Sequence, residues 1–307
     1  RTSLYLLLET LMKGRILTSL LAVIAITGLQ AQETPAVPRL VVGLTIDQLN
    51  MDYVEAFADM FGERGFKRLW REGRVYRNAE YNFNQVDRSS AVAAIYTGTT
   101  PHVNGIVGNA WMDRTSLQVV NCVDDTRFMG IYTSESTSPS RLAVSNLSDE
   151  LIVATQGTAE VYSIAPTREM AVLAAGHASQ GAFWINDETG KWSGSTYYGT
   201  FPSWVSNYND RQGLDFRISD MTWSPYLPVS IYRYLTSETK QVTFKHKFND
   251  ERKNKYRKLK TSPYANEEVN RLVNACLSST SVGRDLVPDM LNLAYYAGNY
   301  DHRPISE

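Results

Sequence analysis

Hydrophobic residues in this chain gather in short β-rich runs, and amphipathic segments separate the runs. The run from Leu40 to Ile46 is almost continuously apolar, which is typical of a strand buried on both faces of a parallel sheet. Further strands are predicted at Ala159 to Ile164 and Met290 to Tyr296, and a hairpin at Gly181 to Ile185 with Trp192 to Tyr198. Strands that alternate with helices predict an α/β fold with a mostly parallel central sheet.

The predicted helices lie between these strands. A compact helix is expected from Ser89 to Tyr96, where Ser89 or Ser90 caps the start and Gly98 ends it. A short strand is expected at Val75 and Tyr76. The other helical patterns cover Tyr53 to Met60, Phe66 to Glu72, Arg168 to Ala175 and Ala265 to Leu277.

The first residues have the pattern of a secretory signal peptide. Lys13 and Arg15 precede the apolar run from Ile16 to Leu29, and a small-residue cleavage site follows at Ala31. The run is shorter than the roughly 20 apolar residues of a membrane helix, so we expect a periplasmic or secreted protein without stable membrane insertion. A membrane anchor is the alternative. The expected organisation is upstream residues plus signal peptide over 1–31, a linker over 32–39 and an α/β domain over 40–307.

Composition and charge narrow the class of protein. Of the 307 residues 43% are apolar, and the net charge is only -1, which excludes a disordered chain. The balance of 31 basic and 32 acidic residues argues against a nucleic-acid partner. The basic stretch near 240–260 is expected to be a solvated insertion, with polyanion binding as the alternative. Cys122 and Cys276 lack the spacing of a zinc knuckle or redox motif and are expected to be free and buried, although a disulfide between them stays open.

Asp47 is the first candidate for chemistry. It stands directly after the strand that ends at Ile46. Ligands of open α/β sheets collect at the carboxyl ends of the strands, so a carboxylate there is a candidate metal or substrate group. A helix N-cap is the alternative role.

An ordered set of motifs resembles the exported alkaline phosphatases of the type I phosphodiesterase/nucleotide pyrophosphatase group, within the alkaline phosphatase superfamily. The set consists of Leu40 to Asp47, Gly65 to Leu69, Ala94 to Pro101, Gly105 to Asn109, Ala175 to His177, Gly190 to Trp192 and Ser195 to Tyr198. The resemblance implies a three-layer α/β/α sandwich. It also implies two zinc ions that activate a hydroxyl nucleophile and then a water molecule. Two such cations can stabilise both the attacking and the leaving oxygen of a phosphate ester.

The site residues that the resemblance implies are only partly present. Asp47 matches the first metal-binding aspartate. Counting back from Thr97, the place of the nucleophile is taken by Arg88, whose guanidinium cannot attack phosphorus. Ser89 is therefore the first candidate nucleophile and Ser90 the second, unless both serines only cap the helix. Asn109 matches an asparagine that contacts the phosphate, with a turn role as the alternative.

The later motifs are also altered. The Lys-x-Arg clamp of monoesterases is replaced by Thr167 and Glu169, which leaves Arg168 or Arg88 to contact the substrate. In the Asp-x-x-x-His metal motif the aspartate place is Gly298, whereas His302 is kept as a metal candidate. His177 is interpreted as structural. The remaining metal ligands of the family would follow Glu307, so this chain by itself is not expected to complete the two-zinc set.

Two functions are therefore predicted. The first is an exported, metal-dependent phosphoric ester hydrolase acting on a small-molecule phosphate ester, with Ser89 as nucleophile and Asp47 and His302 as metal ligands. The second is a non-catalytic periplasmic relative that binds an anionic ligand in the same cleft. A sulfatase-like activity is disfavoured, because the Cys/Ser-x-Pro-x-Arg pattern is missing around Arg88.

Overall fold

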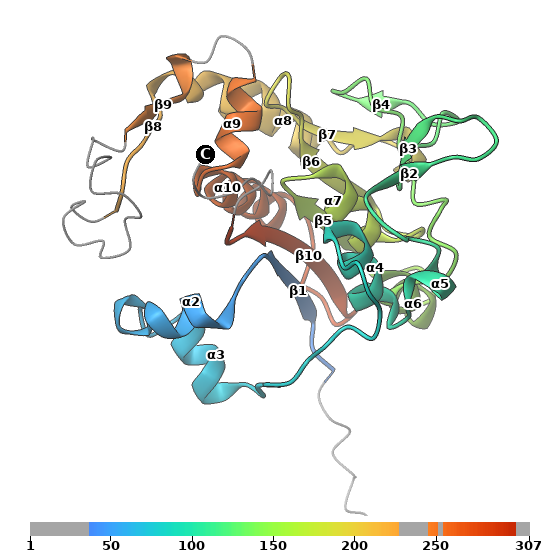
Figure 1. The fold of residues 1–307 in the computed structure, drawn as a ribbon, viewed down its shortest axis with the longest axis horizontal. Helices are drawn as coiled ribbons and strands as arrows, with labels where there is room; N and C mark the ends of the chain where they lie inside the picture. The colour runs from blue at the N-terminus through green and yellow to red at the C-terminus, as the bar shows by residue number, and fades with distance from the viewer. Residues whose placement is uncertain (1–36, 227–244, 251–253, 299–307) are drawn as a thin grey trace, which may run out of the picture. The chain divides into compact units, whose positions relative to one another are not determined.

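A central mixed sheet organises the chain in the computed structural model, which describes residues 37–226, 245–250 and 254–298. The chain divides into a unit of residues 1–38 and a unit of residues 39–307, and the second unit contains the sheet. The strand order is β1 (Leu40–Asp47), β10 (Asp289–Tyr296), β5 (Val161–Ala165), β6 (Gly181–Ile185), β7 (Trp192–Ser195) and β4 (Gly130–Ile131). The strands from β1 to β6 in this order are parallel, and β7 is antiparallel to both of its neighbours (Figure 1).

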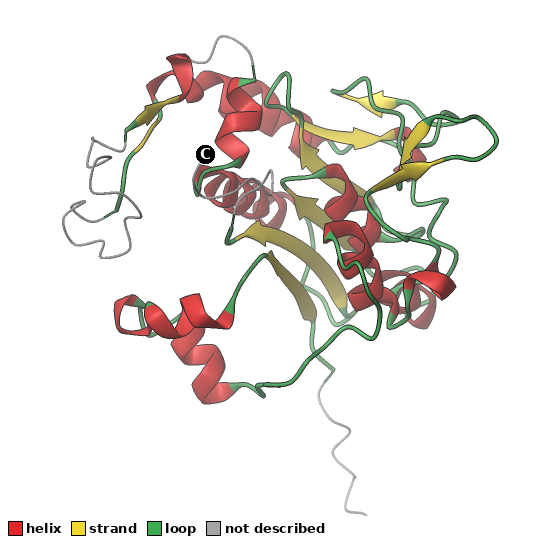
Figure 2. Cartoon of the chain, viewed as in Figure 1, coloured by secondary structure: helices red, strands yellow, loops and turns green. Residues whose placement is uncertain are grey.

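Helices cover both faces of the sheet (Figure 2). One cluster of buried residues packs α4 and α7 against the sheet, and a second cluster packs α8, α9 and α10 against it. Successive residues of β6 belong to different clusters, Trp184 to the first and Phe183 and Ile185 to the second, because side chains alternate along a strand. The predicted α/β/α sandwich is therefore confirmed. The helices of these layers are α4 (Arg88–Thr97), α5 (Pro101–Asn104), α6 (Leu147–Ala154), α7 (Arg168–Ala175), α8 (Ser203–Gln212), α9 (Lys255–Lys260) and α10 (Tyr264–Ser279).

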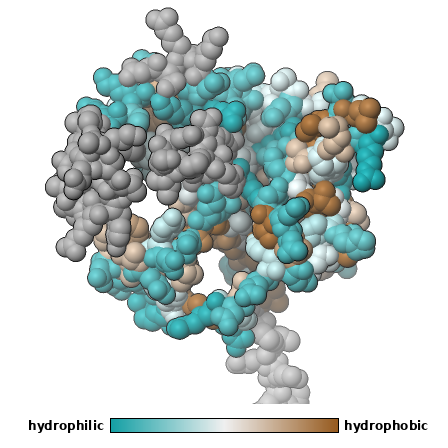
Figure 3. All heavy atoms as spheres, viewed as in Figure 1, coloured by the Kyte–Doolittle hydropathy of each residue, from teal (hydrophilic) through white to brown (hydrophobic). Residues whose placement is uncertain are grey.

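The segment between β1 and α4 contributes little to either cluster. Its helices α2 (Met51–Ala56) and α3 (Phe66–Glu72) bury only Val54 (Figure 2). The face drawn in Figure 3 is mostly hydrophilic, with hydrophobic groups scattered over it. The remaining short elements are β2 (Ala110–Met112), β3 (Val119–Asn121), β8 (Thr222–Trp223), β9 (His246–Lys247) and 3₁₀ helices at Ala58–Met60, Thr196–Tyr198, Leu214–Phe216, Ile218–Asp220 and Phe248–Asp250.

The start of α4 differs from the sequence-based prediction. The helix begins at Arg88, and its N-cap is Asp87 rather than Ser89 or Ser90. The Asp87 carboxylate accepts the Ser90 N–H, and the Ser90 hydroxyl in turn accepts the Asp87 N–H, which forms a reciprocal capping box. Gly98 ends the helix in the left-handed conformation, as predicted.

Two other predictions are corrected. Val75 and Tyr76 form no strand. Among the described residues, no strand pairs with them. The basic segment is solvated only in part where it is described, since Lys245, Lys247 and Arg257 are exposed but α9 buries Tyr256, Leu259 and Lys260. The buried Lys260 ammonium pairs with the Asp187 carboxylate.

The cysteines are as expected, because Cys122 and Cys276 are both free and buried. Within the described ranges, no helix is both long and apolar enough to cross a bilayer. The predicted signal peptide lies outside the described residues and stays a prediction.

Candidate active site

The end of β1 and the start of α4 meet through an ion pair. The Nε group of Arg88 donates to Oδ2 of Asp47 at 2.7 Å, and the two side chains are only 11% and 14% exposed. The ring of Tyr296 also contacts the guanidinium, whose central carbon lies 4.7 Å from the ring centroid. Tyr296 ends β10 directly beside Asp47 in the parallel register. The carboxyl ends of two neighbouring strands therefore hold the first residue of α4.

Asp87 positions both the helix start and the loop that contains Asn109. Its Oδ1 atom accepts hydrogen bonds from Ser90 N at 2.9 Å and from Ser90 Oγ at 2.8 Å. Its Oδ2 atom accepts the backbone N–H of Asn109 at 2.6 Å. One carboxylate thus fixes the geometry between α4 and this loop.

Ser89 and Asn109, two of the sequence-predicted site residues, are brought together. The fully buried Ser89 donates its hydroxyl proton to Oδ1 of Asn109 at 2.7 Å. Asn109 itself is exposed. Within the described part of the chain, its Nδ2 group makes no hydrogen bond, so it is available to donate to a ligand.

Arg168 lies in a different set of contacts, at the start of α7. Its guanidinium pairs with Asp124 at 3.0 Å and with Glu135 and Glu169 at 3.8 Å each. Glu169 also accepts a hydrogen bond from Asn121 Nδ2 at 2.6 Å. The charge of Arg168 is therefore neutralised by neighbouring carboxylates, and none of these contacts involves Ser89 or Asn109.

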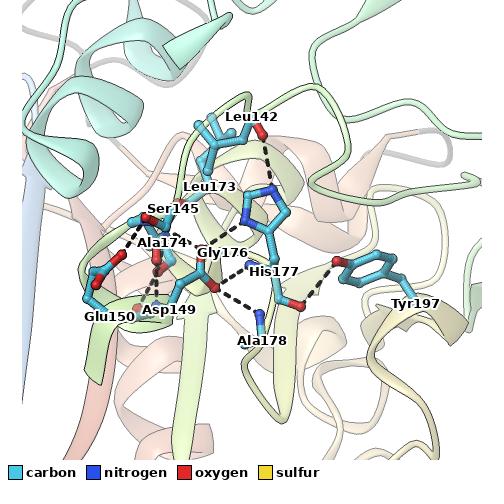
Figure 4. Close-up of polar contacts among 12 residues, drawn as sticks. Leu142, Ser145, Asp149, Glu150, Leu173, Ala174, Gly176, His177, Ala178 and Tyr197 are labelled. Carbon is cyan, nitrogen blue, oxygen red and sulfur yellow. Dashed lines mark hydrogen bonds and ion pairs between the residues drawn. The ribbon is translucent and has the colours of Figure 1, made fainter. Parts of the chain in front are cut away.

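His177 connects α6 to the turn that follows α7 (Figure 4). Its Nδ1 atom lies 2.8 Å from Oδ2 of Asp149, and its Nε2 atom lies 3.0 Å from the carbonyl oxygen of Leu142. The hydrogen bond to Asp149 raises the pKa of His177. Tyr197 donates its hydroxyl to the His177 carbonyl at 3.1 Å. These contacts support the interpretation of His177 as a structural residue.

Gly298, where the resemblance places a second metal-binding aspartate, is closely packed against Gln48. A Cβ atom added at Gly298 would lie 2.5 Å from Oε1 and 2.8 Å from Cβ of Gln48, the residue after Asp47. His302, the other half of this motif, lies outside the described residues.

The described residues do not fit a two-zinc site. Zinc in proteins takes three or four nitrogen, sulfur or oxygen ligands. In the ranges that the structure describes, no group of three His, Cys, Asp or Glu side chains is placed to hold a metal. The carboxylate of Asp47 is paired with a side chain that is already a cation.

Two residues of this site were missed by the sequence analysis. Asp87 was not singled out, although an aspartate three positions before a serine is a recognisable capping pattern. Tyr296 was read only as the end of a strand. Its contact with Arg88 depends on the strand order, which no local pattern reveals.

Known proteins resemble the whole described fold. The family model for type I phosphodiesterase/nucleotide pyrophosphatase matches residues 41–274. The chain is 31% identical over 282 residues to alkaline phosphatase PhoV of Synechococcus elongatus, with 87% of this chain and 51% of that protein covered. It is 30% identical over 302 residues to alkaline phosphatase PafA of Elizabethkingia meningoseptica, with 92% and 55% covered.

A solved structure agrees with these sequence comparisons. The crystal structure of wild-type alkaline phosphatase PafA superposes with a TM-score of 0.75 at 28% identity, over 84% of this chain and 52% of that chain. This chain spans about half the length of the curated relatives it matches. The matched residues and the shared fold show that the chain belongs to the type I phosphodiesterase/nucleotide pyrophosphatase family of the alkaline phosphatase superfamily.

Proposed function

We propose that the protein is a non-catalytic relative of the phosphoric ester hydrolases, and that it binds a small-molecule phosphate ester at the start of α4. Relatives named alkaline phosphatase support the ligand class. The contacts of this chain's own side chains support the absence of hydrolysis.

The observation that carries this proposal is the state of the two serine hydroxyls. Ser89 and Ser90 are both fully buried, and each hydroxyl is committed to a neighbour. Ser89 donates to the neutral amide of Asn109, whereas Ser90 belongs to the helix cap. A hydroxyl nucleophile needs access to phosphorus and activation by a base or a metal. In the described structure both hydroxyls are buried, so neither has that access.

The proposed ligand contacts are Asn109 and Arg88. Because Ser89 occupies Oδ1 of Asn109, the amide is oriented to present its Nδ2 donor to a phosphoryl oxygen. Arg88 lies at the same helix start, where it shares its positive charge with the carboxylate of Asp47. Arg168 is not part of this proposal, because three carboxylates surround its guanidinium.

Hydrolysis with Ser89 as nucleophile is the second candidate function. It is favoured by the contact of 2.7 Å between Ser89 and Asn109, since the resemblance places Asn109 at the phosphate and Ser89 is adjacent to the place of the nucleophile. In that account Asp47 and His302 would hold zinc, which would lower the pKa of the attacking hydroxyl. The ion pair of Asp47 with Arg88 argues against it.

One experiment separates the two functions. The full-length protein is incubated with para-nitrophenyl phosphate and bis-para-nitrophenyl phosphate, with zinc added, and turnover and calorimetric binding are both measured. The proposal predicts binding that Asn109→Asp weakens, because that change replaces a donor by a negative charge. It also predicts no turnover above that of Ser89→Ala. Zinc-dependent turnover that Ser89→Ala abolishes would establish the hydrolase instead.

We also propose that the protein is exported. The pattern of basic, apolar and small residues before Ala31 supports a signal peptide. Amino-terminal sequencing of the secreted or periplasmic protein should begin at Gln32. A start at or before Lys13 in the isolated protein would contradict export by cleavage.

A further inference from the structure

We propose that the guanidinium of Arg88 replaces a metal ion as the permanent counter-charge of Asp47, so that this site recognises its ligand without a metal. The ligand in this statement rests on the proposed function. The charge replacement itself does not, because it concerns only contacts within the chain.

The geometry of the pair is that of a strong charge-assisted hydrogen bond. Arg88 Nε and Asp47 Oδ2 are 2.7 Å apart, and both side chains are mostly buried. A guanidinium keeps its proton at every physiological pH, so its positive charge is always present. The Asp47 carboxylate is therefore neutralised without any bound ion.

Several contacts hold Arg88 in this position. It is the first residue of α4, and the Asp87 capping box fixes the backbone at that point. The ring of Tyr296 packs against the guanidinium, which adds a cation–π interaction. Asp47 and Tyr296 are register partners, so the two groups that contact Arg88 come from one fixed edge of the sheet.

A metal bound to Oδ2 of Asp47 would have to displace this guanidinium from that oxygen. The displaced group would be a mostly buried cation that has lost the Asp47 carboxylate, which is strongly destabilising. It would also remain close to a second positive charge, and like charges at short distance repel.

Gly298 provides an independent observation that points in the same direction. The resemblance places a second metal-binding carboxylate at this position, but Gln48 fills the space that a side chain would need. The site has therefore lost one carboxylate and gained one arginine. The first difference removes a negative charge and the second adds a positive charge, so both make the site less attractive to cations.

The test uses thermal unfolding of the full-length protein with added zinc and with EDTA. The variants are Asp47→Asn, Arg88→Gln and the double variant. Arg217→Gln is the matched control, since Arg217 forms an ion pair with the buried Glu268 in the other core cluster. Elemental analysis of the purified wild type measures the metal that it retains.

If Arg88 replaces the metal, the unfolding midpoint of the wild type should be the same with zinc, with EDTA and with neither. Zinc and EDTA should also leave the difference between the midpoints of the wild type and Asp47→Asn unchanged. The two single variants should each lower the midpoint, and the double variant should lower it by less than their sum. Arg217→Gln should lower the midpoint and leave the coupling between Asp47 and Arg88 intact. A zinc-dependent rise in the wild-type midpoint that Asp47→Asn removes would overturn the proposal, and so would fully additive losses.

Ligand recognition is measured separately. Titration of the wild type with para-nitrophenyl phosphate should give the same affinity with and without EDTA. An affinity that EDTA abolishes would overturn the metal-independent part of the inference. If the ester does not bind while the coupling between Asp47 and Arg88 is found, the proposed function fails and the charge replacement stands.

Discussion

Asp87 uses both of its carboxylate oxygens, one to cap α4 and the other to anchor the backbone of Asn109. The cap stabilises the helix, whereas the anchor sets where the Asn109 amide can meet a ligand. A single side chain therefore links the stability of α4 to the geometry of the proposed ligand site.

Replacing Asp87 should affect both properties. Asp87→Ala should lower the free energy of unfolding by about 1 to 2 kcal/mol, the cost of a lost N-cap. It should also weaken ester binding, because the loop that holds Asn109 loses its anchor. Urea denaturation and calorimetric titration measure the two effects. Asn146→Ala, which removes the capping box of α6, is the matched control and should reduce stability alone. Equal effects of both variants on binding would contradict the role of Asp87.

The two cysteines should be chemically inert in the native protein. Burial raises the pKa of Cys122 to about 12 and that of Cys276 to about 11. The thiolate is the reactive form, so a disulfide reagent at pH of about 8 should label neither residue until the protein is unfolded. Rapid labelling of the native protein at Cys122 would show that the α4 layer opens more readily than the structure implies.

Single residues show where sequence reasoning works and where it stops. The position of Arg88 in place of a hydroxyl follows from counting along the chain, and Gly98 as the helix end follows from its conformational freedom. The partner of Arg88 could not be predicted, because Asp47 lies 41 positions away and only the folded sheet brings the two together. Ser89 and Ser90 were predicted as N-caps, but the N-cap is Asp87, and Ser90 takes part in the cap only as the third helical residue of the capping box.

At the scale of elements, His177 and Asp149 hold α6 against the turn after α7. The Asp149 carboxylate also accepts the backbone N–H groups of His177 and Ala178, at 2.6 and 2.8 Å. Burial opposes its ionisation, but the hydrogen bonds with His177, Asn146 and Ala178 lower the pKa of Asp149 overall. The same pairing raises the pKa of His177.

This pair predicts a specific pH dependence of stability. The raised pKa of His177 gives stabilisation that is complete below its ordinary value of 6.5 and is lost as the pH rises through the folded-state pKa. The lowered pKa of Asp149 gives stabilisation that is present above its ordinary value of 3.8 and is lost as the pH falls through the folded-state pKa. The pair therefore contributes most to the free energy of unfolding between pH 3.8 and pH 6.5.

Denaturation at a series of pH values tests this dependence. Going from mildly acidic to alkaline pH, the wild type should lose stability that His177→Gln does not lose. His102→Gln is the control, since His102 is exposed and lies in α5. An identical pH profile for the wild type and His177→Gln would show that the pair does not titrate as the structure implies.

Elements with strong local patterns were predicted well. The continuous apolar runs of β1 and β10 and the Gly73 stop of α3 all correspond to observed elements. Val75 and Tyr76 have the composition of a strand, but a strand also needs a neighbour to pair with. The described parts of the sheet offer them none. The burial of α9 was not predicted, because basic residues dominate its sequence and its apolar positions, Tyr256 and Leu259, are only two.

At the scale of the whole molecule, stability is distributed unevenly. The two core clusters enclose the sheet from both sides, whereas the segment between β1 and α4 buries only Val54. Few buried contacts mean a low free energy of local opening. Among the described residues, limited trypsin digestion should therefore cut first between Arg64 and Arg77, followed with time by mass spectrometry. A first cut within α7 or α10 would contradict this distribution of stability.

The molecule combines the fold of a known family with an altered site. The fold is that of the alkaline phosphatase superfamily, and the chain spans about half the length of its curated relatives. The sequence resemblance predicted this fold. It could not predict that Arg88 and Asp47 form a pair, and that pair carries the claim that the site works without a metal.

The most direct measurement is anomalous scattering at the zinc edge from crystals of the full-length protein grown with zinc and a phosphate ester. If Arg88 replaces the metal, no anomalous peak should lie within coordinating distance of Asp47, and the Arg88 guanidinium should still be bonded to that carboxylate. A zinc peak on Asp47, with Arg88 turned away from it, would show that the site binds metal after all.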